Sequence, residues 1–350
     1  MRACAEGAAR PDGERRAGGA DTAPGWAASA LDSVLARVAR TRAEAGARFP
    51  LYADPDSGRW RTTARGSWTG GFWAGLLWLL ARHTGAPSDR EAAQACTARL
   101  ADWAGADTST RGLIFWYGTL FAADDGGARV RVRDVGARAC RDAFDPRLGL
   151  VPWGSAFGGP GTTARVDGVP GMVPLLATVD PEAAGSHLRR HLDLCLSTRP
   201  PSWSWLRTGA TGWTARADPP SGWSRGPAWL LLAVAEGAPL LADGSLARIT
   251  DALAPTCSVP LADLAHPDGP LDTSAAAVTA LALLRLGHRD RAVTVLDTLV
   301  GRHLTADGRL LDGCYDLGAG TALRHELIWG DFFLAYSLAE LTGRVSGHPG

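Results

Sequence analysis

Six positions along this 350-residue chain carry side chains that could do chemistry, each where an apolar segment begins. They are Trp68, Arg111, Asp167, Arg225, Asp272 and Asp331. A carboxyl group can transfer protons or cap a helix, a guanidinium can bind an anion, and an indole offers a flat face to a sugar. For the aspartates, a catalytic and a structural interpretation are therefore both open.

The segments that follow these positions form a weak internal repeat. Each starts with a Gly, Asp or Ser and continues into apolar helix-forming residues, and the starts recur about every 40 to 60 residues. Amphipathic, Arg-rich stretches such as 89–104 and 290–304 lie between them. An apolar helix is buried, whereas an amphipathic one faces water. The alternation predicts an all-α fold, an (α/α)6 barrel with an inner and an outer ring of helices.

Local signals mark the ends of the expected helices. Asp272 and Asp331 are suitable N-terminal caps, and Pro227 suits a first helical turn. Gly85 and Gly287 are suitable C-terminal stops. In a ring of parallel inner helices all six N-termini open on one face, where partial positive charge favours an anionic ligand such as a uronate.

The composition argues against several other classes. The formal net charge is zero without a basic stripe, so we expect no nucleic-acid partner. All 36 basic residues are Arg, which excludes a lysine Schiff base and a P-loop lysine. No apolar run reaches the roughly 18 residues of a membrane span. We expect no membrane association, and without a GxGxxG before a helix we expect no dinucleotide-binding fold.

The remaining predictions concern organisation and compartment. Residues 1–25 are predicted to be a disordered tail, and residues 26–345 a single catalytic domain. The tail lacks the apolar stretch of a signal peptide, so we expect a cytoplasmic protein. The six cysteines are far apart and form no CxxC pair, which indicates buried small residues. We predict neither a metal nor another cofactor.

Several motifs resemble those of unsaturated glucuronyl hydrolases, glycoside hydrolase family 88, and in part the related family 105. The stretch 68–78, WTGGFWAGLLW, is similar to a family signature. The stretches 223–229, 272–276 and 328–333 follow in the family's order. The stretch 167–176 resembles the setting of the family's general acid/base. Together these motifs cover the chain from about Trp60 to Leu341.

The resemblance implies a reaction and roles for individual residues. The substrate would be a small saccharide, or a glycosylated small molecule, ending in a C4–C5 unsaturated uronate. Asp167 would protonate C4 of this vinyl ether, water would add at C5, and the hemiketal would collapse to release the aglycone. Arg225 would pair with a carboxylate or a ring hydroxyl. The walls of the sugar site would be Trp68, Trp73, Trp223 and Trp229.

The chain also departs from the family pattern. Ser109 and Thr110 stand where family 88 has a His-Asp pair, a pair that family 105 lacks as well. The stretch 201–205 replaces a motif that ends in histidine. Arg111 or Arg216 could supply new anion contacts. Arg111 could equally form an inter-helix salt bridge.

Two further hypotheses therefore stand beside hydrolysis. The same barrel could host another reaction, for example that of a dehydratase or a sugar-tailoring enzyme in a biosynthetic pathway. It could also be a sugar-binding pseudoenzyme, which would keep the tryptophans without needing Asp167. The sequence does not specify an oligomeric state.

Overall fold

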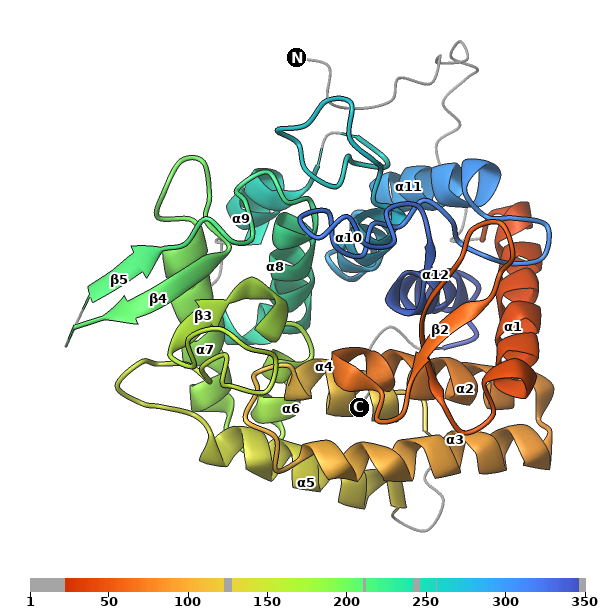
Figure 1. Cartoon of the computed structure of the whole chain (residues 1–350), viewed down its shortest axis with the longest axis horizontal. Coiled ribbons are helices and arrows are strands. Elements are labelled where there is room, and N and C mark those ends of the chain that lie inside the picture. Colours follow the sequence, from red (N-terminus) through yellow and green to blue (C-terminus); the bar gives the residue numbers. More distant parts are fainter. Residues whose placement is uncertain (1–22, 123–127, 210–211, 242–245, 256, 346–350) are drawn as a thin grey trace.

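Two concentric rings of helices make up the fold (Figure 1). It was obtained as a computed structural model that describes residues 23–122, 128–209, 212–241, 246–255 and 257–345. The inner ring consists of α2 (Gly70–Thr84), α4 (Arg111–Thr119), α6 (Met172–Ala177), α8 (Arg225–Glu236), α10 (Thr273–Arg285) and α12 (Ile328–Leu341). The outer ring consists of α1 (Gly25–Ala45), α3 (Pro87–Arg99), α5 (Ala128–Asp142), α7 (Pro181–Cys195), α9 (Leu246–Leu253) and α11 (Arg289–Arg302).

Burial follows the apolar pattern of the sequence. In α2 every residue from Gly70 to Ala81 is buried, and α12 is buried over nearly its whole length. The outer helix α11 buries only Ala292, Val295, Leu296 and Leu299, the stripe expected of an amphipathic helix. Each inner helix contacts the next, and α12 returns to α2, which closes the ring. The predicted (α/α)6 barrel is confirmed.

Glycines allow the inner helices to approach closely. A Cβ on Gly71 of α2 would lie 2.3 Å from the carbonyl oxygen of Leu113 in α4. A Cβ on Gly112 of α4 would lie 2.1 Å from the backbone nitrogen of Met172 in α6. The first three inner helices are therefore in backbone contact, because these positions have no side chain.

Most of the predicted helix ends are found in the structure. Asp272 caps α10 by accepting the N–H of Ser274 at 3.1 Å. Gly85 ends α2 in the left-handed conformation, and Gly287, with a φ of 81°, follows the end of α10. The prediction is wrong for Asp331, because α12 begins three residues earlier. Asp331 is buried inside the first turn and accepts the N–H of Leu310 at 3.3 Å.

The third inner helix is shorter than the helix that its apolar segment predicted. Gly171 has a φ of 69° and separates α6 from the short 3-10 turn η3 (Val166–Gly168). Asp167 thus lies in a separate turn before α6 rather than at its N-terminus. The other 3-10 turns are η1 (Ser67–Thr69), η2 (Leu100–Trp103) and η4 (Ala238–Leu240).

Two small antiparallel sheets join the loops. One has the order β2-β1-β6, formed by β1 (Phe49–Ala53), β2 (Trp60–Thr63) and β6 (Glu326–Leu327). The other has the order β3-β4-β5, formed by β3 (Thr163–Arg165), β4 (Ser204–Thr208) and β5 (Gly212–Ala215). In the second sheet Arg165 pairs with Ser204, and Trp205 pairs with Ala215. This sheet carries part of the candidate site.

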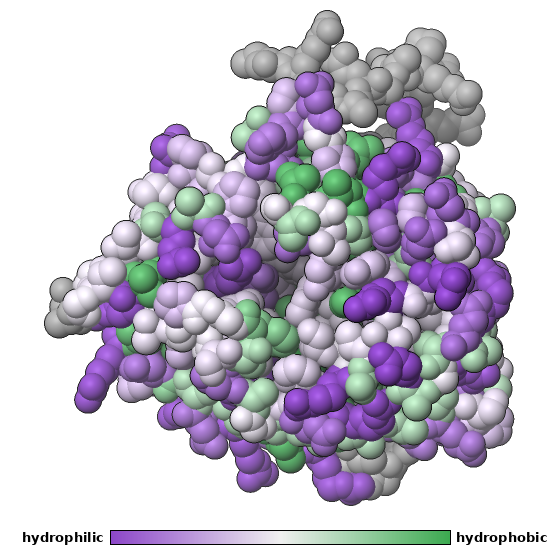
Figure 2. Space-filling view, in the orientation of Figure 1, coloured by the Kyte–Doolittle hydropathy of each residue, from purple (hydrophilic) through white to green (hydrophobic). Residues whose placement is uncertain are grey.

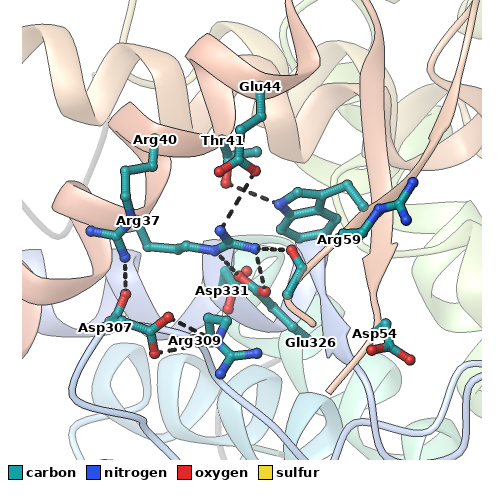
Figure 3. Close-up of polar contacts among 12 residues, drawn as sticks. Arg37, Arg40, Thr41, Glu44, Asp54, Arg59, Asp307, Arg309, Glu326 and Asp331 are labelled. Carbon is teal, nitrogen blue, oxygen red and sulfur yellow. Dashed lines mark hydrogen bonds and ion pairs between the residues drawn. The ribbon is translucent and has the colours of Figure 1, made fainter. Parts of the chain in front are cut away.

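A buried ion pair links the first outer helix, α1, to β6, the short strand directly before α12 (Figure 3). Arg37 of α1 donates from Nε and Nη2 to the two carboxylate oxygens of Glu326, both at 2.9 Å. Asp331 lies beside this pair, and burial, reinforced by the Glu326 carboxylate, raises its pKa well above the usual range. The cluster holds elements from the two ends of the described chain together.

The predicted tail and the expected lack of membrane spans can be compared with the described residues only in part. Most of the predicted tail, residues 1–25, lies outside the described residues, while α1 already begins at Gly25. In the part of the chain that the structure describes, no helix is long and apolar enough to cross a bilayer.

Candidate active site

A cavity of about 1130 Å³ opens where the inner helices begin. Its lining comes from η1 before α2, from the starts of α4 and α8, from η3, and from strands β3 and β4. Loop residues from the ranges 153–160, 216–223, 262–269 and 314–318 complete it. Figure 2 shows that this face is hollowed near its centre, with hydrophilic residues along the left side of the hollow. The volume is sufficient for a saccharide of a few residues.

Five of the seven predicted site residues line this cavity. They are Trp68, Asp167, Trp223, Arg225 and Trp229. Trp73 and Arg111 are not part of the lining. Trp73 is buried inside α2. Arg111 is also buried and donates to the backbone carbonyls of Ala106, at 3.0 Å, and Ala139, so it joins α4 to the end of α5.

Asp167 is partly exposed to the cavity, and its partner is a neighbour in the chain. The Nε of Arg165 lies 3.0 Å from Oδ1 and 3.2 Å from Oδ2 of Asp167. The Asp167 carboxylate raises the pKa of the Arg165 guanidinium. The carboxylate is therefore held by a cation, and no helix N–H is among the partners of its side chain in the described residues.

Aromatic rings form part of the cavity wall. Trp68 packs against Trp329 with ring centroids 4.9 Å apart, and Trp229 packs edge-on against Phe333 at 5.7 Å. Trp223 faces the guanidinium of Arg225 at 5.2 Å. Packed rings of this kind present flat apolar surface at little entropic cost, because their rotamers are already fixed.

Arg225 is largely occupied by partners within the protein. Its Nη1 binds the carboxylate of Asp272 and the carbonyl oxygen of Cys314, and its Nη2 donates to the carbonyl oxygen of Tyr315 at 2.8 Å. The Asp272 side chain is completely buried. Arg225 consequently fixes the 314–315 loop that forms one side of the cavity.

Sequence reasoning missed three prominent lining residues. Trp153 lies under the guanidinium of Arg165, 5.1 Å from carbon to ring centroid. Arg165 itself stands two residues before Asp167, which could have been a signal. Tyr315 packs on Tyr52 and Trp329, and burial raises its pKa. Of the two residues that replace the family's His-Asp pair, Thr110 lines the cavity and Ser109 does not.

Two histidines of α7, His187 and His191, form a buried layer near Asp167. His187 Nδ1 accepts the N–H of Val151 at 3.1 Å, and His191 Nδ1 donates to the His187 carbonyl oxygen at 2.9 Å. Burial lowers the pKa of His191 to about 4, and burial with the neighbouring His191 lowers the pKa of His187 well below its usual value. These imidazoles are held neutral at ordinary pH.

The cavity contains both signs of charge. Arg165, Arg216 and Arg225 contribute cations, and carboxylates come from Asp167, Asp218, Asp263, Asp268 and Asp316. Within the described ranges, no three His, Cys, Asp or Glu side chains are grouped so that they could hold a metal ion.

Comparisons with known proteins agree with this fold. No family model matches the chain. A curated unsaturated glucuronyl hydrolase from Bacillus sp. (strain GL1) is 26% identical over 372 residues, covering 91% of this chain and 97% of the relative. The resemblance to unsaturated glucuronyl hydrolases is therefore confirmed over nearly the whole chain.

Solved structures extend the likeness to three dimensions. One that is named with the saccharide dGlcA-Glc-Rha-Glc has a TM-score of 0.80 and 23% identity, over 92% of this chain and 98% of the other. An unsaturated glucuronyl hydrolase from Streptococcus agalactiae has a TM-score of 0.78 and 15% identity, over 91% and 92% of the two chains. At these identities the likeness shows the fold.

Proposed function

We propose that this relative of the unsaturated glucuronyl hydrolases is itself a hydrolase of saccharides ending in a C4–C5 unsaturated uronate. The observation that carries the proposal is the position of Asp167. It is the carboxyl group in η3 that lines an open, tryptophan-walled cavity, in a barrel that resembles these enzymes over nearly its full length.

In the proposed reaction Asp167 acts first as an acid and then as a base. Its carboxyl proton passes to C4 of the vinyl ether, whose π electrons form the new C–H bond and leave the cation shared by C5 and the ring oxygen. Water attacks C5 and returns a proton to the Asp167 carboxylate. The resulting hemiketal opens, and the aglycone leaves with a proton. One carboxyl group suffices, unlike the two of ordinary glycosidases.

The surrounding residues position the sugar. Trp68, Trp223 and Trp229 supply flat walls, and the rigid packing behind them fixes their orientation. The partner of the site is a small saccharide, or a glycosylated small molecule with the same sugar end. A cytoplasmic location and a single domain over residues 26–345 remain part of this proposal.

Turnover of defined substrates tests the proposal. The protein is incubated with a panel of lyase-generated unsaturated disaccharides, and loss of the ultraviolet absorbance of the double bond is followed. We expect turnover by the wild type and a loss of at least about a thousandfold in Asp167→Asn. Asp193→Asn, an exposed position on α7 outside the cavity, is the matched control and should retain the activity.

The outcomes separate the alternatives. Turnover that survives in Asp167→Asn would remove Asp167 from the chemistry while leaving the reaction class intact. Saccharide binding that persists without turnover on every member of the panel would indicate a sugar-binding protein instead of a hydrolase.

A further inference from the structure

Three side chains lie in one row across the β3-β4-β5 sheet, beside Asp167. Arg165 pairs with Ser204 in the adjacent strand. The backbone N–H of Arg216, which directly follows β5, donates to the Ser204 carbonyl oxygen at 2.9 Å. Arg165, Ser204 and Arg216 all line the cavity. Neighbouring strands lie about 4.8 Å apart, so the row places one arginine on either side of one serine.

The middle residue of this row has an unused hydrogen-bonding group. Ser204 is 1% exposed, and its Oγ has no hydrogen-bond partner among the described residues. A buried hydroxyl without a partner is unfavourable by about 1–3 kcal/mol. Because Ser204 lines the cavity, rotation of its side chain would bring this hydroxyl to a ligand oxygen, which is a suitable partner for it.

The two flanking cations are also incompletely satisfied. In the described residues, the Arg165 guanidinium has, besides its Nε contact to Asp167, the face of the Trp153 ring and a 3.7 Å ion pair from Nη1 to Asp218, whose carboxylate is 82% exposed. Among the described residues, the Arg216 side chain forms no hydrogen bond or ion pair. Arg225, in contrast, could turn toward a ligand only by leaving the buried Asp272 carboxylate without its cation and two backbone carbonyls without this donor.

We infer that Arg165, Ser204 and Arg216 together bind the carboxylate of the substrate's terminal sugar, and that Arg165 exchanges Asp167 for this carboxylate when the substrate enters. The inference rests on the proposed function and specifies how the substrate is selected. Paired guanidinium groups bind a planar carboxylate with charge-assisted hydrogen bonds. The exchange also releases the Asp167 carboxyl group from its contact with Arg165 when the substrate is bound.

Methyl esterification of the substrate carboxylate tests this selection. With the wild type, we expect kcat/KM for the unsaturated disaccharide to exceed that for its methyl ester by at least about thirtyfold, because the ester cannot form the charged hydrogen bonds. In Arg165→Gln the ratio should fall to within about threefold of one. Arg216→Gln and Ser204→Ala should lower it by smaller factors. The matched control is Arg207→Gln, on β4 beside Trp213 and outside the cavity lining, which should keep the wild-type ratio.

A binding measurement tests the exchange separately from turnover. In Asp167→Asn, Arg165 loses its close charged partner and keeps the 3.7 Å ion pair with the exposed Asp218. We therefore expect Asp167→Asn to bind the unsaturated acid more tightly than the same variant carrying Arg165→Gln, by at least about tenfold in Kd. The methyl ester should bind both proteins equally, as measured by calorimetry.

The results distinguish failure of the inference from failure of the proposed function. An acid-to-ester ratio that is unchanged in Arg165→Gln, with normal turnover of the acid, overturns the inference and leaves the proposed function intact. Absence of both turnover and binding with every saccharide overturns both. Should Arg165→Gln fail to fold, as judged by circular dichroism, Arg216→Gln and Ser204→Ala decide, and an unchanged ratio in both refutes the carboxylate site.

Discussion

The buried histidine His191 should make the barrel sensitive to mild acid. Its pKa is about 4 in the folded protein, where burial is the largest cause, and 6.5 for an ordinary histidine. A group with a lowered folded pKa contributes stability that is present above pH 6.5 and is lost as the pH falls toward 4. The difference of about 2.5 units corresponds to roughly 3 kcal/mol, of which about 1.5 kcal/mol is lost between pH 6.5 and 5.0.

The variant His191→Asn isolates this contribution. An asparagine can still donate to the carbonyl oxygen of His187, as Nδ1 of His191 does at 2.9 Å, but it does not titrate. The smaller side chain lowers the free energy of unfolding at every pH, so the comparison is between slopes. We expect the loss between pH 6.5 and 5.0 to be about 1.5 kcal/mol smaller in the variant than in the wild type.

Urea unfolding followed by tryptophan fluorescence measures these slopes at constant ionic strength. The control His288→Asn removes a histidine at the start of α11, outside the buried layer, and should reproduce the wild-type slope. Parallel curves for the wild type and His191→Asn over this range would refute the reasoning, because His191 would then not be held neutral by burial.

Two further predictions concern the stability of the barrel, through a close helix contact and a buried ion pair. Gly71→Ala should lower the free energy of unfolding by at least about 3 kcal/mol, because its Cβ would lie 2.3 Å from the Leu113 carbonyl oxygen. Gly301→Ala in α11, where a Cβ meets nothing within 4 Å, should be neutral or slightly stabilising, and equal losses in urea unfolding would contradict the close approach. Arg37→Met should cost about 3–5 kcal/mol, because it leaves the buried Glu326 without its cation. Arg40→Met, on the exposed side of the same helix, should cost less than about 1 kcal/mol, and a similar loss in thermal unfolding would show that the Arg37 pair is not a buried one.

Much of the fold was predictable because the apolar pattern of a fully buried helix differs from that of a helix exposed on one side, and this difference recurs along the sequence. Segments such as Gly70–Thr84 and Ile328–Leu341 are apolar on all sides and can only be buried, whereas Arg289–Arg302 has one apolar stripe. The helix boundaries were less certain. Asp331 has the residue type of a cap, but the pairing of β6 with β1 comes directly before α12 and moves the helix start upstream.

The site was predictable only where one residue and its immediate neighbours decide the outcome. Asp167, Trp68 and Trp223 reach the cavity because they lie at the starts of inner segments. Arg111 occupies an equivalent position, yet its long side chain turns back to the Ala106 carbonyl, a contact set by the loop conformation. The row that includes Arg165 and Ser204 depends on strand register, which short strands do not specify from sequence.

The Arg37–Glu326 pair joins α1 to the strand directly before α12, and so connects the two ends of the ring. Each hairpin touches mainly its neighbours, so an opened ring would behave as a linear array that can fray from either end. The pair joins residues 289 positions apart, and closing a loop of that length costs about 5 kcal/mol in chain entropy. We therefore expect the first and last hairpins to dock late in folding. Once docked, they convert a set of separately unravelling repeats into a unit that unfolds cooperatively.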